Sequence, residues 1–174
     1  MGKCLRELRI EDAEYMLEWM VDQETAQMFQ FDTTNVGIEK VLDFINDSAC
    51  DKLSRHFAIV DRKDEYMGTI SLKGIDEYAK KAEYAIVLRK CARGTGLSRK
   101  ATDEILALAF NELGLSRVFL NVFSSNSHAI EFYHDFGFTY EGEFRNHIYA
   151  KGKIHSIQWF SMMKEEYVRR FGEC

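Results

Sequence analysis

Hydrophobic residues recur along this chain with two spacings, and each spacing predicts a type of secondary structure. Steps of three and four residues, typical of amphipathic helices, alternate with segments of strand period or short apolar runs. Helices are expected at Glu11–Val21, Ile38–Ile45, Leu97–Leu113 and Ser127–Phe136. Strands are expected at Leu5–Arg9, His56–Val60, Tyr66–Lys73, Ala82–Leu88, Arg117–Phe123, Phe138–Arg145 and Ile154–Met163.

The order of these elements predicts the fold class. It runs strand, two helices, three strands, helix, strand, helix and two strands. This order favours an α/β (mixed α+β) chain, with a central mixed sheet of about six to seven strands and helices on both faces, over a doubly wound parallel sheet. A length of 174 residues, 46% of them hydrophobic, is expected to form a single domain over residues 1–174.

Charge and composition narrow the function classes. With 23 basic and 28 acidic residues, the formal net charge of −5 argues against a general nucleic-acid binder. No apolar run approaches the roughly 18–20 residues of a membrane span, and the N-terminal stretch lacks an apolar signal core, so a cytoplasmic protein is expected. The four cysteines form no C-x-x-C pair and are expected to be free thiols. No histidine motif suggests a metal site, so none is expected.

Two glycines mark the turn between the strand Ala82–Leu88 and the helix that begins at Leu97. The first turn of a helix has backbone N–H groups without internal partners, and the helix dipole adds partial positive charge there. Gly94 and Gly96 carry no Cβ, so a ligand can approach the backbone closely. The surrounding cations are Arg89, Lys90, Arg93, Arg99 and Lys100. The pattern predicts a cradle for a small phosphate-bearing ligand, although the glycines could also serve only the turn, with the cations solvated.

The same segment resembles a known superfamily. Arg93-Gly94-Thr95-Gly96-Leu97-Ser98 is similar to the pyrophosphate motif Gln/Arg-x-x-Gly-x-Gly/Ala of the GNAT N-acetyltransferases. SSNSHAIEFYHDFGF resembles the second signature of that superfamily: an Asn, an Ala-Ile pair, a Tyr and a Gly-Phe. The resemblance is specific over about residues 66–163 and is closest to the branch of ribosomal-protein N-terminal, polyamine and amino-sugar acetyltransferases. Ser98 stands where the family has Gly or Ala, and Lys90-Cys91 replaces the usual Pro before the loop.

The resemblance implies a splayed sheet and acetyl-CoA as the cosubstrate. The pantetheine arm is expected to run between Ala82–Leu88 and Arg117–Phe123, and a backbone N–H near Leu88 is expected to meet the developing oxyanion. Asn126 is expected to contact the cofactor, to cap the following helix, or both. The cofactor-binding residues are expected to be Ile86, Val87, Leu88, Arg93, Gly94, Thr95, Gly96, Leu97, Ser98, Arg99 and Asn126.

The implied reaction moves an acetyl group from the thioester to a primary amine. The amine must lose a proton, because an alkylammonium has a pKa of about 10, and the thiolate leaving group benefits from gaining one. Tyr133 is the expected acid, with a core aromatic as the alternative. Glu83 is the expected base because it is the one carboxylate in an apolar strand. An ion-paired or solvated Glu83, with a water chain instead of a dedicated base, is the alternative.

The acceptor is expected to lie between the first two helices and the hairpin at 144–153. Three acceptors fit: an amino sugar, a polyamine or a protein N-terminus. A non-catalytic acetyl-CoA-binding sensor or interaction domain is the rival interpretation, and a homodimer is possible. Aromatic residues that could line the pocket, or could simply pack, are Trp19, Phe29, Phe31 and Tyr149, and carboxylates that could attract an amine, or remain solvated, are Asp22, Glu24 and Asp32.

Overall fold

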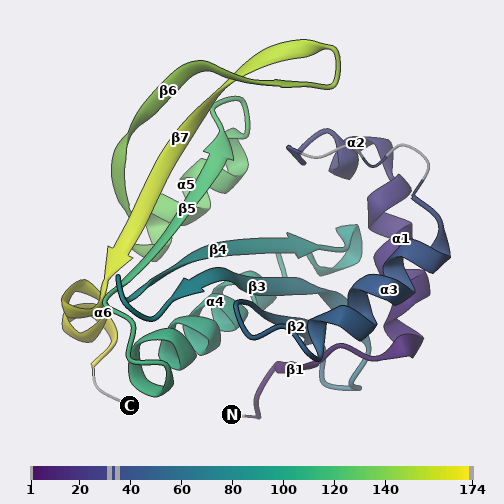
Figure 1. Cartoon of the computed structure of the whole chain (residues 1–174), viewed down its shortest axis with the longest axis horizontal. Coiled ribbons are helices and arrows are strands. Elements are labelled where there is room, and N and C mark those ends of the chain that lie inside the picture. The colour runs from purple at the N-terminus through teal and green to yellow at the C-terminus, as the bar shows by residue number, and fades with distance from the viewer. Residues whose placement is uncertain (1, 31–32, 34–35, 173–174) are drawn as a thin grey trace.

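A computed structural model describes residues 2–30, 33 and 36–172 of the chain, and its elements follow the expected order (Figure 1). The strands are β1 Leu5–Glu7, β2 Arg55–Val60, β3 Tyr66–Asp76, β4 Lys81–Leu88, β5 Arg117–Phe123, β6 Thr139–Ala150 and β7 Lys153–Met163. The helices are α1 Ala13–Val21, α2 Gln23–Ala26, α3 Ile38–Ser48, α4 Leu97–Ala107, α5 Ser127–Phe136 and α6 Lys164–Phe171.

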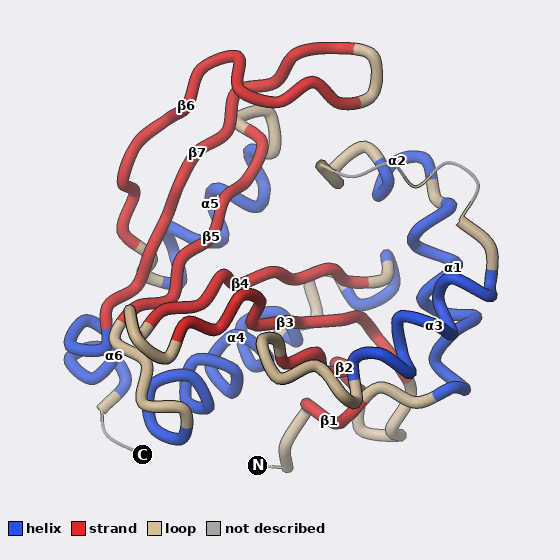
Figure 2. The backbone as a smooth tube through the Cα atoms, in the orientation of Figure 1, coloured by secondary structure: helices blue, strands red, loops and turns tan. Residues whose placement is uncertain are grey.

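The described strands form one seven-stranded sheet in the order β1-β2-β3-β4-β5-β7-β6 (Figure 2). Within that part of the chain, β4 and β5 are parallel, and every other neighbouring pair is antiparallel. The expected mixed sheet is therefore confirmed.

Two hydrophobic clusters lie on opposite faces of the sheet, because strand residues alternate between faces. On one face, α4, α5 and α6 cover β3, β4, β5 and β7, with Ile105 and Phe136 fully buried. On the other face, α1 and α3 cover β2 and β3 through residues such as Met16 and Val41. The expectation of helices on both faces is thus confirmed, and the α1–α3 layer covers the N-terminal half of the sheet (Figure 1).

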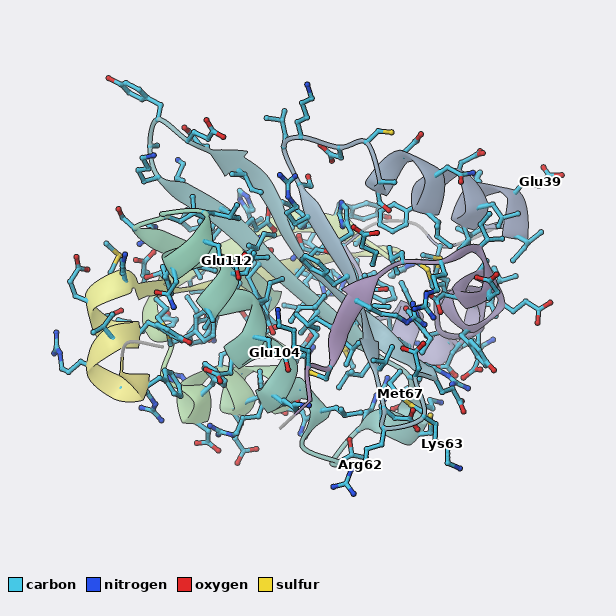
Figure 3. The ribbon with its side chains drawn as sticks, turned by 90° about the horizontal axis from the view of Figure 1, so that it is seen from below. Glu39, Arg62, Lys63, Met67, Glu104 and Glu112 are labelled. Carbon is cyan, nitrogen blue, oxygen red and sulfur yellow. The ribbon has the colours of Figure 1, made fainter. Side chains whose placement is uncertain are left out.

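Some elements differ from the pattern in the sequence. The helix α6 was not predicted, because its short amphipathic stretch follows the last strand without a turn residue. The helix α4 ends in a π-helical turn, Leu108–Glu112, and Gly114 follows it with a φ of 64°. Glu104 on α4 accepts hydrogen bonds from the backbone N–H groups of Cys4 and Leu5, which joins this helix to β1 (Figure 3).

Three further sequence expectations concern the cysteines, membrane spans and metal sites, and the structure bears on them only for the described residues. Cys4, Cys50 and Cys91 are free thiols, and Cys174 lies outside the described residues. In the described part of the chain, no helix has the length and apolarity needed to cross a membrane. No group of three or more His, Cys, Asp or Glu side chains in that part is arranged to hold a metal ion.

The strands β4 and β5 pair only at their beginnings, and this determines where a ligand can enter the sheet. Three registered pairs join them, from Lys81 opposite Arg117 to Glu83 opposite Phe119. Beyond Glu83, β4 continues to Leu88 alongside β3, while β5 continues to Phe123 alongside β7. The sheet therefore opens between the two strands, as the splayed sheet requires (Figure 1).

Gly68 allows β3 and β4 to approach each other closely beside this opening. A Cβ built at Gly68 would lie 2.3 Å from the carbonyl oxygen of Val87 on β4. We expect Gly68→Ala to lower the free energy of unfolding by about 2 kcal/mol, because the backbone must shift to remove the clash. Urea denaturation measures this loss.

Gly37 provides the matched control. It precedes α3 at a φ of −98°, and no heavy atom lies within 4 Å of a Cβ built there. Gly37→Ala should change the unfolding midpoint far less than Gly68→Ala. An equal midpoint shift in the two variants would contradict the close approach.

Candidate functional site

The loop between β4 and α4 has the backbone conformation that its glycines predict. Gly94 and Gly96 adopt φ values of 74° and 84°, in the left-handed region that glycine favours. No heavy atom lies within 4 Å of a Cβ built at either position. The space that these two side chains would occupy is therefore open to a ligand.

The first turn of α4 presents backbone amides to this loop. Gly96 is the residue that precedes the helix, and it has no side chain to cap that helix end. The hydroxyl of Thr95 donates to the carbonyl oxygen of Ala92 at 2.6 Å and accepts one long hydrogen bond, of 3.5 Å, from the N–H of Leu97. The amides of Leu97, Ser98 and Arg99 therefore lie in the turn where helical N–H groups lack internal partners, which is the geometry of an anion site.

The cations near the loop are less available than the sequence suggested, because acidic residues of α1 and α2 engage them. Arg89 pairs with Glu18 at 3.0 Å and with Glu65 at 2.9 Å. Lys90 pairs with Asp22 at 2.9 Å and with Glu24 at 3.0 Å. These pairs join the α1–α2 segment to the loop, so Arg89 and Lys90 are not free counter-charges for a phosphate.

Arg93 and Arg99 retain partly exposed positions beside the loop. Arg93 donates to the hydroxyl of Thr25 at 2.8 Å, and its contact with Glu24 is longer, at 3.4 Å. The guanidinium of Arg99 lies 5.4 Å from the ring centre of Phe136 and makes one long hydrogen bond of 3.4 Å, to the carbonyl oxygen of Asp135. The guanidinium of Arg99 is weakly held and can turn toward a phosphate, whereas Arg93 would exchange its hydrogen bond with Thr25 for one to the phosphate.

The second half of β4 has one hydrogen-bonded edge and one edge that faces the opening. Ile86, Val87 and Leu88 are half-buried and pair with β3. Arg89 donates its N–H to the carbonyl oxygen of Met67. Amide directions alternate along an antiparallel pair, so the N–H of Leu88 points away from β3, toward the β5 side. This is the direction expected of a donor to a ligand in the opening.

Asn126 caps α5, as one of its two expected roles requires. Its side-chain oxygen accepts from the backbone N–H of Ala129 at 3.2 Å. The side-chain N–H₂ group of Asn126 has no hydrogen bond to the described residues, so a ligand contact by that group remains a prediction.

Tyr133 lies on α5 and packs into the core on the α4–α5 face of the sheet. It is 7% exposed, and its ring lies 6.1 Å from the ring of Tyr84 on β4, measured between centroids. Burial raises the pKa of the Tyr133 phenol above its usual value, so the phenol stays protonated at neutral pH. The position is compatible both with core packing and with proton donation.

Glu83 is the last residue of β4 that pairs with β5, and its carboxylate is held by two donors. Lys73 Nζ lies 3.2 Å from Glu83 Oε1, and Asn121 Nδ2 donates to the same oxygen at 3.3 Å. The side chain remains 32% exposed. Glu83 alternates with Ala82 and Tyr84, which are buried on the α4–α5 face, so Glu83 points to the opposite face.

The opening between β4 and β5 therefore has a carboxylate on one face and a buried phenol on the other. The amide cradle lies at the far end of the same strand, where β4 leads into α4. A thioester carrier threaded between the strands would meet a proton acceptor from one side and a proton donor from the other. This arrangement suits acyl transfer to an amine that approaches from the Glu83 face.

A hollow of about 440 Å³ lies beside the paired beginnings of β4 and β5. Phe119, which pairs with Glu83, forms part of its wall, while Glu83 itself does not line it. Its volume lies within the range of small-molecule sites, about 300–1,000 Å³. The lining residues are Lys81, Arg117, Phe119, Glu141, Gly142, Phe144 and Trp159.

The expected acceptor residues do not gather into one pocket. Trp19 is 5% exposed and donates to the hydroxyl of Tyr66, so it belongs to the core, where Phe29 packs against it. Tyr149 is 74% exposed on the hairpin. Asp22 accepts from Thr25 and Lys90, which lowers the pKa of its carboxyl, and Glu24 pairs with Lys90 and Arg93. Phe31 and Asp32 lie outside the described residues.

Sequence reasoning missed part of this site. Asn121 was visible as a polar residue inside an apolar strand, but no pattern connected it with Glu83. Gln30, which donates to Asn121, carried no signal, because its partner lies 91 residues away in the chain. Phe119 and Trp159 looked like ordinary strand residues.

Comparison with known proteins identifies the family. Residues 5–163 match the family model described as Acetyltransferase (GNAT) domain. An uncharacterized N-acetyltransferase, p20, of Bacillus licheniformis is 27% identical over 94% of this chain and 93% of its own length. Spermidine N(1)-acetyltransferase of Escherichia coli K12 is 24% identical over 94% of this chain and 87% of its own.

A solved structure has the same fold. Spermidine N-acetyltransferase of Vibrio cholerae, in complex with CoA and spermine, superimposes with a TM-score of 0.87. The superposition covers 94% of this chain and 96% of the other, at 20% identity.

Proposed function

This chain belongs to the GNAT family of acetyl-CoA-dependent N-acetyltransferases, and we propose that its acceptor is a small cationic primary amine of the polyamine class. Relatives named spermidine N(1)-acetyltransferases support this class. A carboxylate on the exposed face of the opening also supports it, since Glu83 can attract an alkylammonium. A hexosamine and a protein N-terminus are the other acceptors that the test below includes.

One observation carries the proposed reaction: β4 and β5 separate immediately after Glu83, and the opening follows β4 toward an amide cradle at the start of α4. Acetyl-CoA fits these features. The amides at Gly94–Arg99 would hold its diphosphate, with Arg93 and Arg99 as counter-charges. The free edge of Ile86, Val87 and Leu88 would accompany its pantetheine arm, and Asn126 would contact the cofactor from the start of α5. Acetyl-CoA supplies the activated acyl group when bound.

The residues on either face of the opening have complementary roles in the proposed transfer. Glu83 accepts a proton from the ammonium, directly or through a water molecule, so that the free amine can attack the thioester carbonyl carbon. The new C–N bond replaces the C–S bond, and the phenol of Tyr133 supplies the proton that the departing thiolate takes up. The acylated nitrogen then loses its second proton, which restores the phenol through solvent. The N–H of Leu88, which points away from β3, would donate to the carbonyl oxygen as negative charge develops on it.

An amine panel tests this function. Purified protein is mixed with acetyl-CoA and with spermidine, glucosamine or a short peptide with a free N-terminus, and thiol release is followed. We expect release to depend on the amine and to be fastest with spermidine. Faster release with glucosamine or the peptide would assign the acceptor to that class instead.

A sensor that binds acetyl-CoA without turnover would give a different result. It would be stabilised by acetyl-CoA in a thermal melt, by about 2.7 kcal/mol at a concentration 100 times its Kd, yet release no thiol with any amine. Glu83→Gln is the matched catalytic control. It should lower the amine-dependent rate at about pH 7 by roughly 100-fold, the contribution of a general base, without changing acetyl-CoA affinity.

We also propose that residues 1–174 act as a single domain and that copies associate, at least as a homodimer. Both hydrophobic clusters pack on one continuous sheet, which supports the first statement. The exposed apolar side chains Phe144, Tyr149 and Ile154 on the β6–β7 hairpin support the second. A Vibrio cholerae relative is described as dodecameric.

A further inference from the structure

A chain of polar side chains crosses the open face of the sheet where β4 and β5 begin to separate. It joins four segments. Gln30, which follows α2, donates to Asn121 Oδ1 on β5. Asn121 Nδ2 donates to Glu83 Oε1 on β4, and Lys73 Nζ on β3 lies 3.2 Å from the same oxygen.

The directions of these hydrogen bonds are mutually dependent. The amide of Asn121 has a donor end and an acceptor end. Gln30 occupies the acceptor end, which leaves the N–H₂ group facing the carboxylate of Glu83. The carboxylate of Glu83 only accepts hydrogen bonds, so the reversed amide would place two oxygens together there. Gln30 donates to the oxygen of Asn121 and so anchors the amide from its other end.

The two oxygens of Glu83 differ as a result. Oε1 receives both Lys73 and Asn121. Within the described part of the chain, Oε2 has no hydrogen-bond donor. Oε1 is thus held in place by its two donors, and Oε2 is available to an ammonium or to a water molecule at the opening.

We propose that Asn121 is a positioning residue for acetyl transfer: held by Gln30, it orients Glu83 so that Oε2 faces the acceptor amine. This inference rests on the proposed function. It adds a role for a residue on β5 and connects Gln30, which follows α2, with the chemistry. A misplacement of about 1 Å at a reacting group can cost up to about 100-fold in rate.

Packing alone gives little reason for these residues. Asn is disfavoured in strands, and position 121 lies between Val122 and Leu120, which serve the core on the other face. Lys73 and Glu83 are 43% and 32% exposed, so their ion pair contributes little to stability. The two donors to Glu83 Oε1 instead fit a role in orienting this carboxylate for the reaction.

Asn121→Asp tests the proposal with almost no change of shape. Asp keeps an acceptor for Gln30 but replaces the donor to Glu83 with a like charge. We expect kcat/KM for the amine that wild-type protein acetylates fastest to fall by about tenfold or more, with the Kd for CoA unchanged. Asn111→Asp is the matched control, because Asn111 is exposed on the π-helical turn that ends α4. It should match wild type.

Gln30→Ala tests the outer end of the chain of hydrogen bonds. It should lower kcat/KM in the same direction as Asn121→Asp but by a smaller factor, because Asn121 still donates to Glu83 and loses only its anchor on the other side. Gln27→Ala, an exposed glutamine in the same segment, is its control and should have no effect. Equal rates for Gln30→Ala and Gln27→Ala would contradict the role of Gln30.

A double-mutant cycle distinguishes positioning from a general structural effect. If Asn121 acts through Glu83, Asn121→Asp should have little further effect in a Glu83→Gln background. Additive losses in an active enzyme would overturn the inference while leaving the proposed function intact. Failure of the proposed function looks different, because wild-type protein would then release no thiol with any amine.

A crystal structure of Asn121→Asp decides the question independently of turnover. We expect the carboxylate of Glu83 to leave its place beside residue 121, while Lys73 remains its partner. A carboxylate with the wild-type orientation would overturn the inference.

Discussion

Gly96→Asp should lower the affinity for CoA by at least about 100-fold. Gly96 sits immediately before α4 at a φ of 84°, and the space at its Cβ position is open. A carboxylate there would occupy the cradle and repel a diphosphate. The loss of two hydrogen bonds to a charged group, at about 1.5–3 kcal/mol each, corresponds to about two to four powers of ten in affinity. Isothermal titration with CoA measures the change.

Gly37→Asp is the control for this experiment. Gly37 also precedes a helix, α3, and has open space at its Cβ position, but its φ of −98° suits any residue. Asp is a favoured residue at a helix start, so this variant should fold at least as well as wild type and should bind CoA normally. Unchanged CoA affinity in Gly96→Asp would mean that the diphosphate is held elsewhere.

Most of the fold was predictable because its elements have strong local signals. All seven strands and the four longer helices among the described residues were expected, since apolar period and turn glycines are properties of neighbouring residues. The helix α2 is too short to show a period, and α6 follows β7 with no intervening turn residue. The separation of β4 and β5 came from family resemblance, because strand pairing is a non-local property.

In the candidate site, too, features that depend on neighbouring residues were predictable and contacts between distant residues were not. The glycine loop and the cap at Asn126 depend on residues a few positions apart, and the sequence showed them. The pairing of Arg89 with Glu18 and the contact between Gln30 and Asn121 span 71 and 91 residues, so no local pattern contains them. The sequence showed a cluster of cations near the loop but could not show that α1 and α2 bring carboxylates to it. In the folded chain, attraction between opposite charges holds these carboxylates against the cations of the loop.

Tyr133→Phe should lower kcat by about 100-fold or more, the usual contribution of a general acid, while the Kd for CoA stays the same. The change removes one oxygen from a side chain that is 7% exposed and leaves its ring contacts with Tyr84 and Phe138. Single-turnover measurements with a saturating amine isolate the chemical step. Normal turnover in this variant, with chemistry shown to limit the rate, would remove Tyr133 as the acid.

Tyr167→Phe separates the lost acid from a lost buried hydroxyl. Tyr167 belongs to the same hydrophobic cluster, is 1% exposed, and donates to Asp103 at 3.2 Å. Its replacement should cost about 1 kcal/mol of stability but leave kcat unchanged.

The pH dependence of the rate gives a second distinction between Tyr133 as the acid and Tyr133 as a core residue. Because burial raises the pKa of Tyr133, its phenol keeps its proton throughout the neutral and mildly alkaline range. The ratio of wild-type to Tyr133→Phe rates should therefore stay constant between about pH 7 and 9, whereas a tyrosine with the ordinary pKa near 10 would begin to lose its advantage at the upper end.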